Sequence, residues 1–163
     1  MTTTSASPGS AVHTTFTIER QLKANPKRAF RAWADPASKQ KWFACHGDWT
    51  TLEYRLDFRP GGSERNYTAD GDGLLHAYDA HYLDVVEDIR IVYAYEMRLG
   101  ETRISVSLAT VTFEPSAAGT RMLFTEQVVF LDGYPDDGMR RQGTELGLDS
   151  FEAFLEREAG GVH

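Results

Sequence analysis

The sequence predicts an α+β domain in which a curved antiparallel sheet wraps around one long C-terminal helix. Three observations support this fold class. An alternating segment near the N-terminus precedes two short helical patterns, several alternating segments separated by turns follow between about residues 50 and 130, and an amphipathic segment closes the chain. An antiparallel sheet must bury one face, and only the last segment is long enough to cover it.

Local patterns indicate the first strand and the two helices after it. From about residue 14, Phe16 and Ile18 alternate with polar residues, which is the period of a half-buried strand. Asn25, followed by Pro26, is placed to cap a helix. Asp35 before a proline ends that helix and begins a second. The apolar anchors of the two helices are Phe30, Trp33, Trp42 and Phe43.

Strand patterns separated by turn residues fill the middle of the chain. The predicted strands cover residues 51–58, 63–69, 74–86, 89–97, 102–114 and 120–130. Most of the connections between them are short enough for hairpins. The arrangement is an antiparallel meander, which disfavours a parallel doubly wound sheet.

The segment from about residue 137 to 158 is predicted to be one amphipathic helix. Gly143 and Gly147 lie one turn apart on its apolar face, although glycine inside a helix costs about 1 kcal/mol relative to alanine. Close approach of the backbone to the sheet, or space for a ligand, would account for them. The full inward face is predicted to hold Met139, Gly143, Leu146, Gly147, Ser150, Phe151, Phe154 and Leu155.

Composition narrows the class of protein. The 163 residues suit one domain, which we expect to span residues 14–158 between a disordered tail at 1–13 and a short tail at 159–163. The net charge of −7 disfavours nucleic acid as a partner, and no apolar run approaches a membrane span. The basic residues closest to a cluster are interpreted as solvated surface; these are Lys39, Lys41, Arg140 and Arg141.

The cysteine and histidine content argues against disulfide and metal sites. Cys45 is the single cysteine, so no intrachain disulfide can form, and a cytoplasmic location is expected. The five histidines have no metal-binding spacing, and no phosphate loop or dinucleotide fingerprint is present. We therefore predict neither metal nor cofactor. Cys45 beside His46 suggests a nucleophile, but adjacent residues rarely point together, and packing of the nearby aromatics explains the segment better.

Five segments together resemble a known family. They are WADPASKQKWF, RPGGSERNY, HAYDAHYLDVVEDIRIVYAYEM, EPSAAGTRMLFTEQ and GTELGLDSFEAFL. Their order and spacing are similar to the bacterial branch of the activator-of-heat-shock-protein-90-ATPase homologue family, within the SRPBCC (START-like, Bet v 1-like) superfamily. The resemblance implies a helix-grip fold with a cavity for an apolar or amphipathic small molecule. It does not support chaperone activation, because the co-chaperone uses an additional N-terminal domain.

Glu126 is the first candidate site residue. It lies on the same alternation as Phe124 and Val128, so it should face inward, where burial disfavours the charged form unless Arg, Tyr or His answers it. An outward turn at a bulge, or a structural pair with an arginine, is the alternative. His76 and Tyr78 share one strand face and would offer a second polar end, with His76 as a candidate acid–base group or a structural residue.

Aromatic residues and the two helix glycines complete the predicted cavity. The predicted cavity residues are Trp42, Phe43, Trp49, His76, Tyr78, Tyr93, Tyr95, Phe124, Glu126, Gly143, Gly147 and Phe151. Two functions fit such a cavity: the chain is a carrier or sensor of an apolar ligand, or a cofactor-independent enzyme of cyclase, dehydratase or hydrolase type that uses Glu126 or His76. The third alternative is a protein-interaction domain that acts through its surface, for which a homodimer is one arrangement.

Overall fold

The computed structural model describes residues 8–44 and 47–161. Its elements are β1 (Ala11–Leu22), α1 (Pro26–Ala34), α2 (Pro36–Phe43), β2 (Thr50–Leu56), β3 (Ser63–Ala69), β4 (Leu75–Val86), β5 (Arg90–Leu99), β6 (Thr102–Pro115), β7 (Thr120–Leu131) and α3 (Met139–Gly161). This is the predicted α+β class and element order. β1 begins a few residues before the expected Thr14, and α3 starts and ends later than predicted.

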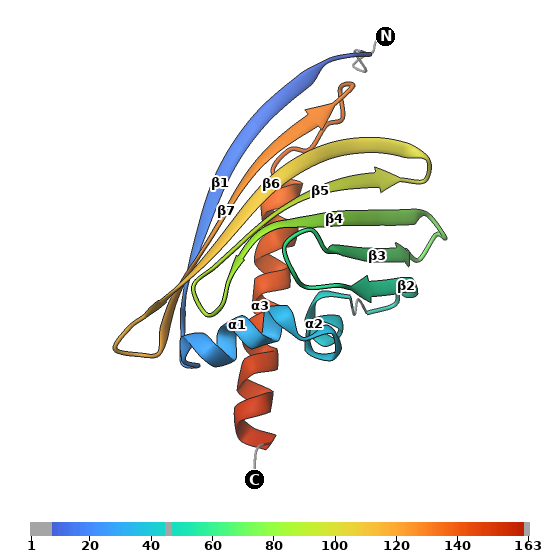
Figure 1. Ribbon diagram of the computed structural model, residues 1–163. Helices are drawn as coiled ribbons and strands as arrows, with labels where there is room; N and C mark the ends of the chain where they lie inside the picture. The colour runs from blue at the N-terminus through green and yellow to red at the C-terminus, as the bar shows by residue number, and fades with distance from the viewer. Residues whose placement is uncertain (1–7, 45–46, 162–163) are drawn as a thin grey trace.

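The strands form one antiparallel sheet in the order β1-β7-β6-β5-β4-β3-β2. The first and last strands are neighbours, with Ala11 opposite Leu131 and Leu22 opposite Thr120. The sheet curls around α3, which runs across its inner face, while α1 and α2 lie beside the lower part of that helix (Figure 1). The predicted helix-grip arrangement is confirmed.

The two short helices begin at the predicted caps. The side chain of Asn25 accepts a hydrogen bond from the backbone N–H of Arg28, at 2.9 Å, and that of Asp35 accepts one from Ser38, at 3.0 Å. The two helices meet where the rings of Trp33 and Trp42 approach to 4.9 Å between centroids. Phe151 of α3 packs on both of these rings, so a single aromatic junction joins the three helices.

Tyrosines line the inner face of the two central strands. Tyr78 and Tyr82 of β4 and Tyr93 and Tyr95 of β5 are all buried. The ring centroids are 5.5 Å apart for Tyr82 and Tyr93, 6.1 Å for Tyr93 and Tyr95, and 4.8 Å for Tyr78 and Tyr95. The tyrosine row therefore faces α3 and the helix pair, rather than forming an exposed amphipathic surface.

The predicted inward face of α3 is partly wrong. Met139 and Leu146 are 62% and 61% exposed, and Ser150 is exposed as well. The buried residues of the helix are Leu148, Phe151, Phe154 and Leu155. The inward arc is centred near Phe151, so positions at three- and four-residue spacing from it face the sheet. Leu146 lies outside that arc, although its spacing from other apolar residues suggested otherwise.

No helix within the described ranges is long and apolar enough to cross a membrane. Across those same ranges, no group of three or more His, Cys, Asp or Glu side chains is arranged to hold a metal ion.

Candidate functional site

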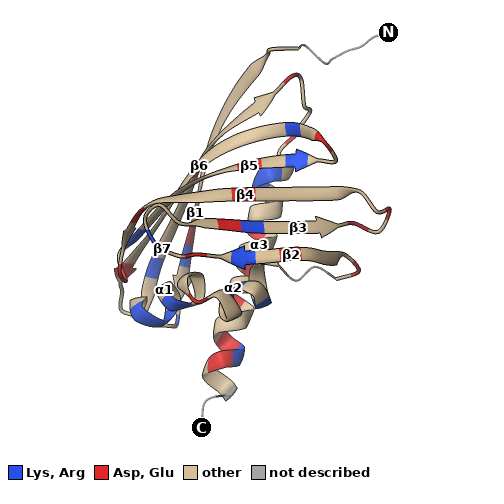
Figure 2. Cartoon of the chain, turned by 45° about the vertical axis from the view of Figure 1, so that its right-hand side comes forward, with Lys and Arg blue, Asp and Glu red and all other residues tan. Residues whose placement is uncertain are grey.

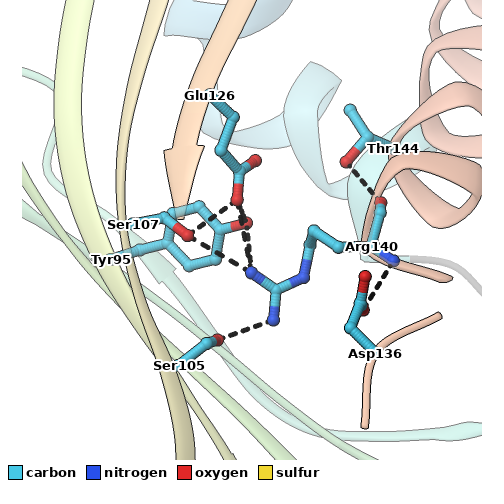
Figure 3. Close-up of polar contacts among 7 residues, drawn as sticks. All are labelled: Tyr95, Ser105, Ser107, Glu126, Asp136, Arg140 and Thr144. Carbon is cyan, nitrogen blue, oxygen red and sulfur yellow. Dashed lines mark hydrogen bonds and ion pairs between the residues drawn. The ribbon is translucent and has the colours of Figure 1, made fainter. Parts of the chain in front are cut away.

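The candidate site is a buried polar cluster around Glu126 on the inner face of β7 (Figure 3). Oε2 of Glu126 accepts hydrogen bonds from the hydroxyls of Tyr95, at 2.6 Å, and Ser107, at 2.7 Å. Nη1 of Arg140 lies 3.2 Å from the same oxygen. Its Nη2 donates to Ser105 at 2.6 Å, so the guanidinium links α3 to β6 and β7. The sequence suggested that a buried Glu126 needs an Arg, Tyr or His partner, and the structure provides both Arg140 and Tyr95.

Arg140 reaches this cluster because of how α3 begins. Asp137 and Gly138 adopt left-handed φ values of 50° and 78°, which turn the chain sharply before the helix. The carboxylate of Asp136 then accepts a hydrogen bond from the backbone N–H of Arg140 at 2.9 Å and caps the first turn. This turn presents Arg140 to the sheet. The interpretation of Arg140 as solvated surface is wrong, since its side chain is only 13% exposed.

Arg140 and Tyr95 keep their protons in this cluster. Burial alone would lower the pKa of Arg140, but the neighbouring Tyr95 and Glu126 raise it above the ordinary value for arginine. Burial, and then the charge of Glu126, raise the pKa of Tyr95 and keep its hydroxyl protonated as a donor. The cluster therefore holds one positive and one negative charge, surrounded by neutral hydroxyl groups.

One atom of the cluster is left without a partner. Oε1 of Glu126 is buried and has no hydrogen-bond partner among the residues that the structure describes. Leaving a buried acceptor unsatisfied costs about 1–3 kcal/mol, and buried polar groups without a partner are few in native proteins. This oxygen is therefore the position in the cluster where an added hydrogen-bond donor would contribute most.

Arg140 also lines a groove of about 390 Å³ between the sheet and the start of α3. The groove has an apolar wall from β1 and β7, which includes Phe16, Val128 and Phe130. Tyr134 and Asp136, from the loop before α3, form its other side. Arg140 borders the groove and contacts Glu126, which does not itself line the groove.

The two helix glycines do not mark tight packing. A Cβ atom added to Gly143 or Gly147 would meet no atom within 4 Å, so the backbone of α3 does not approach the sheet closely at either position. Of the two explanations that the sequence left open, close backbone approach is wrong. Gly143 is exposed, so the prediction that it faces inward is wrong, whereas Gly147 is half-buried and has open space beside it.

A second buried ion pair was missed by sequence reasoning. Nζ of Lys39 lies 2.9 Å from Oε1 of Glu64, and both side chains are 0% exposed. Glu64 also accepts hydrogen bonds from the hydroxyls of Tyr82 and Tyr54, each at 2.8 Å. Burial lowers the pKa of Lys39, and Glu64 offsets only part of this effect. Lys39 is therefore not the solvated surface residue that the sequence suggested.

The ammonium group of Lys39 is enclosed by aromatic rings. It lies 4.4 Å from the ring centroid of Phe43, 5.0 Å from Trp33, 5.7 Å from Trp42 and 5.9 Å from Tyr93. The charges of Lys39 and Glu64 are paired, and both carboxylate oxygens of Glu64 accept hydrogen bonds. This cluster therefore has no carboxylate oxygen without a partner, unlike Glu126. The useful sequence signal was the three-residue spacing of Lys39 and Trp42, which puts them on one helix face.

The predicted site residues fall into two groups. Seven aromatic side chains are joined by ring contacts or lie on the buried face; these are Trp42, Phe43, Tyr78, Tyr93, Tyr95, Phe124 and Phe151. His76 and Trp49 form a separate pair at the edge, with ring centroids 4.3 Å apart. His76 also lies 3.0 Å from a carboxylate oxygen of Asp70. Its contacts are therefore different from those of Glu126. Cys45 and His46 lie outside the described residues.

A larger groove, of about 630 Å³, lies on the outer face of the sheet. Charged residues of both signs gather there on β2 to β5 (Figure 2). At its centre, Asp79 accepts hydrogen bonds from Arg65, at 3.0 Å, and from the hydroxyl of Tyr67, at 2.7 Å, and Arg98 lies 3.5 Å away. Because these opposite charges already pair with one another, this groove is a weaker candidate for a binding site than the Glu126 cluster.

Comparisons with known proteins identify the family. The family described as "Activator of Hsp90 ATPase homolog 1-like protein" matches residues 23–158, and this range contains Glu126, Arg140 and the whole of the inner sheet face except β1. The chain belongs to this family. The resemblance seen in the sequence is thereby confirmed, and with it the assignment to the SRPBCC superfamily.

Solved structures of similar proteins support the fold. A putative uncharacterized protein from Rhizobium leguminosarum is 67% identical, with a TM-score of 0.90, and the alignment covers 93% of this chain and 99% of that one. Protein Mll3558 from Rhizobium loti is 39% identical, with a TM-score of 0.83 and coverage of 89% and 99%. An AHSA1-like protein from Aeromonas hydrophila, 20% identical, shares the fold with a TM-score of 0.66 over 92% and 97% of the chains. No curated protein matches the chain.

Proposed function

We propose that this protein binds a small amphipathic molecule between the sheet and α3, with the Glu126 cluster holding its polar end. The observation that carries the proposal is the buried Oε1 of Glu126, which has no donor among the described residues. A ligand that supplies this donor removes an energetic cost present in the free protein.

The surroundings suit the rest of such a ligand. The groove beside Arg140 offers the apolar surface of Phe16, Val128 and Phe130. Arg140 also contacts the hydroxyl of Tyr95, which belongs to the tyrosine row. The open space beside Gly147 would leave room for a ligand along α3. Concave, mostly apolar sites with a few polar groups that fix orientation are typical of small-molecule binding.

Entry requires movement at Arg140. Oε1 of Glu126 has no contact with solvent, and Arg140, which borders the groove, is bound to the other oxygen of the same carboxylate. We therefore expect the Arg140 side chain to shift when the ligand enters, as a flexible side chain at a pocket wall can do without any change of fold. Glu126 and His76 belong to separate clusters, so they would not act as a pair, and acid–base chemistry by either one alone stays a prediction.

Native mass spectrometry of protein purified from its own host tests the proposal. The wild type should retain a small molecule that is released on unfolding, and Glu126→Gln should lose it, because glutamine turns its amide N–H₂ toward the position of Oε1. Glu114→Gln, at an exposed carboxylate of β6, is the matched control and should retain the ligand. A wild-type protein without any retained molecule, and without affinity for simple amphiphiles, would contradict the proposal.

A further inference from the structure

We propose that the ligand of this site presents an uncharged hydrogen-bond donor, a hydroxyl or an amide N–H, to Glu126, and that the Arg140–Glu126 pair excludes charged head groups. This inference rests on the proposed function and specifies its ligand class. It starts from the charge count of the cluster, in which one arginine and one glutamate face three neutral hydroxyl groups.

The head group must donate a hydrogen bond. Oε2 of Glu126 already accepts from Tyr95, Ser107 and Arg140, whereas Oε1 accepts from no described residue. A carboxylate oxygen can only accept, so a ligand group that also only accepts gains nothing there. Ethers, ketones and carboxylates are therefore poor partners for this position.

The head group must also be neutral. The side chains of Glu126 and Arg140 are 1% and 13% exposed, and they balance each other at 3.2 Å. An ammonium group would satisfy Oε1, but it would add a second positive charge beside Arg140 without a second carboxylate. A buried charge without its own partner is strongly disfavoured. Only a neutral donor satisfies the oxygen and leaves the charge balance unchanged.

Changing either charged residue should change the preferred class of ligand. In Glu126→Gln, the amide oxygen should accept from Tyr95, Ser107 and Arg140, so the N–H₂ group takes the place of Oε1. The site then offers a donor beside an unpaired arginine, which favours a carboxylate ligand. In Arg140→Met, Glu126 becomes an unpaired anion, which favours an ammonium ligand.

The experiment compares four probes with the same octyl chain: octanol, octyl methyl ether, octylammonium and octanoate. Displacement of an apolar fluorescent dye at neutral pH measures binding to the wild type, Glu126→Gln and Arg140→Met. The wild type should bind octanol at least about tenfold more tightly than either ion, and several-fold more tightly than the ether, which has no donor. Octanoate should rank first for Glu126→Gln, and octylammonium for Arg140→Met.

The outcomes separate this inference from the proposed function. If none of the four probes binds to the wild type, both are wrong. If the wild type binds octylammonium or octanoate as tightly as octanol, the site exists but the neutral-donor inference is wrong. The wild-type comparison requires no substitution, so it decides the question even if a variant fails to fold. Circular dichroism of each variant identifies such a failure, and unchanged probe order in folded variants would also overturn the inference.

Discussion

Replacement of Lys39 by methionine should greatly destabilise this domain. The substitution keeps most of the apolar stem of the side chain but removes the charge that lies 2.9 Å from Glu64. Glu64 is then a buried carboxylate that retains only hydrogen bonds from Tyr54 and Tyr82. Because an unpaired charge in the interior is costly, the free energy of unfolding should fall.

The structure sets the size of this loss. Removing one partner of a buried ion pair typically costs about 3–5 kcal/mol, and the two tyrosine hydroxyls that remain on Glu64 place the loss near the lower end. Loss of the contacts between the Lys39 ammonium and its surrounding aromatic rings adds about 1 kcal/mol. The expected total is about 4 kcal/mol, from a domain whose stability should be about 5–15 kcal/mol.

Urea unfolding monitored by tryptophan fluorescence measures this loss, since Trp33 and Trp42 flank the Lys39 ammonium. Lys41→Met, at an exposed position of the same helix, is the control and should change stability by less than about 0.5 kcal/mol. The double variant Lys39→Met with Glu64→Gln removes both charges and should recover most of the loss. A single variant that loses less than about 1 kcal/mol, or a double variant that recovers nothing, would refute the reasoning.

Two further predictions concern glycine and tyrosine. Gly147→Ala should raise the free energy of unfolding by about 0.5–1 kcal/mol, since its Cβ meets no atom. Gly62→Ala should lower it, because its Cβ would clash with the backbone oxygen of Asp57. Urea unfolding of both variants checks the opposite signs. Stability should fall as pH rises above about 10, because burial raises the pKa of Tyr78, Tyr82, Tyr93 and Tyr95 in the folded protein, whereas unfolded tyrosines ionise there. Urea midpoints that stay constant between about pH 9 and 11 would contradict this.

The fold was predictable because its signals are local and periodic. Strands alternate, helices begin at Asn25 and Asp35, and glycine-containing turns separate the strands, so element order follows from short windows of sequence. The inward direction of Glu126 was also predictable, because it shares its alternation with Phe124 and Val128, which are both buried. Such a pattern defines which side chains share a face without any knowledge of distant contacts.

The partners of the buried charges were not predictable in the same way. Lys39 and Glu64 are 25 positions apart, and Glu64 lies in no apolar pattern that marks its face as buried. On β3, the inward residues are Glu64, Asn66 and Thr68, so polarity alone suggests an exposed strand. The spacing of Lys39 and Trp42 puts Lys39 on the buried face of α2, but only the tertiary contact of α2 with β3 and β4 shows that the polar side chains of β3 face the interior.

The prediction of the inward face of α3 was partly wrong for a related reason. Apolar residues occur around much of this helix, and spacing alone fits more than one face. The face that packs is decided by the left-handed turn at Asp137 and Gly138, which directs Arg140 toward Glu126.

A homodimeric or other surface role for the domain stays a prediction.

The pairing of β1 with β7 has a consequence for how the chain folds. Thr17 and Thr125, which face each other across these strands, are separated by 108 positions, so β1 leaves the ribosome long before its partner β7 has been made. Contacts between distant parts of a chain slow folding, because a long loop must close before any contact is gained. β1 therefore remains an unpaired, half-apolar segment throughout synthesis, and the domain can complete its sheet only after translation has passed β7.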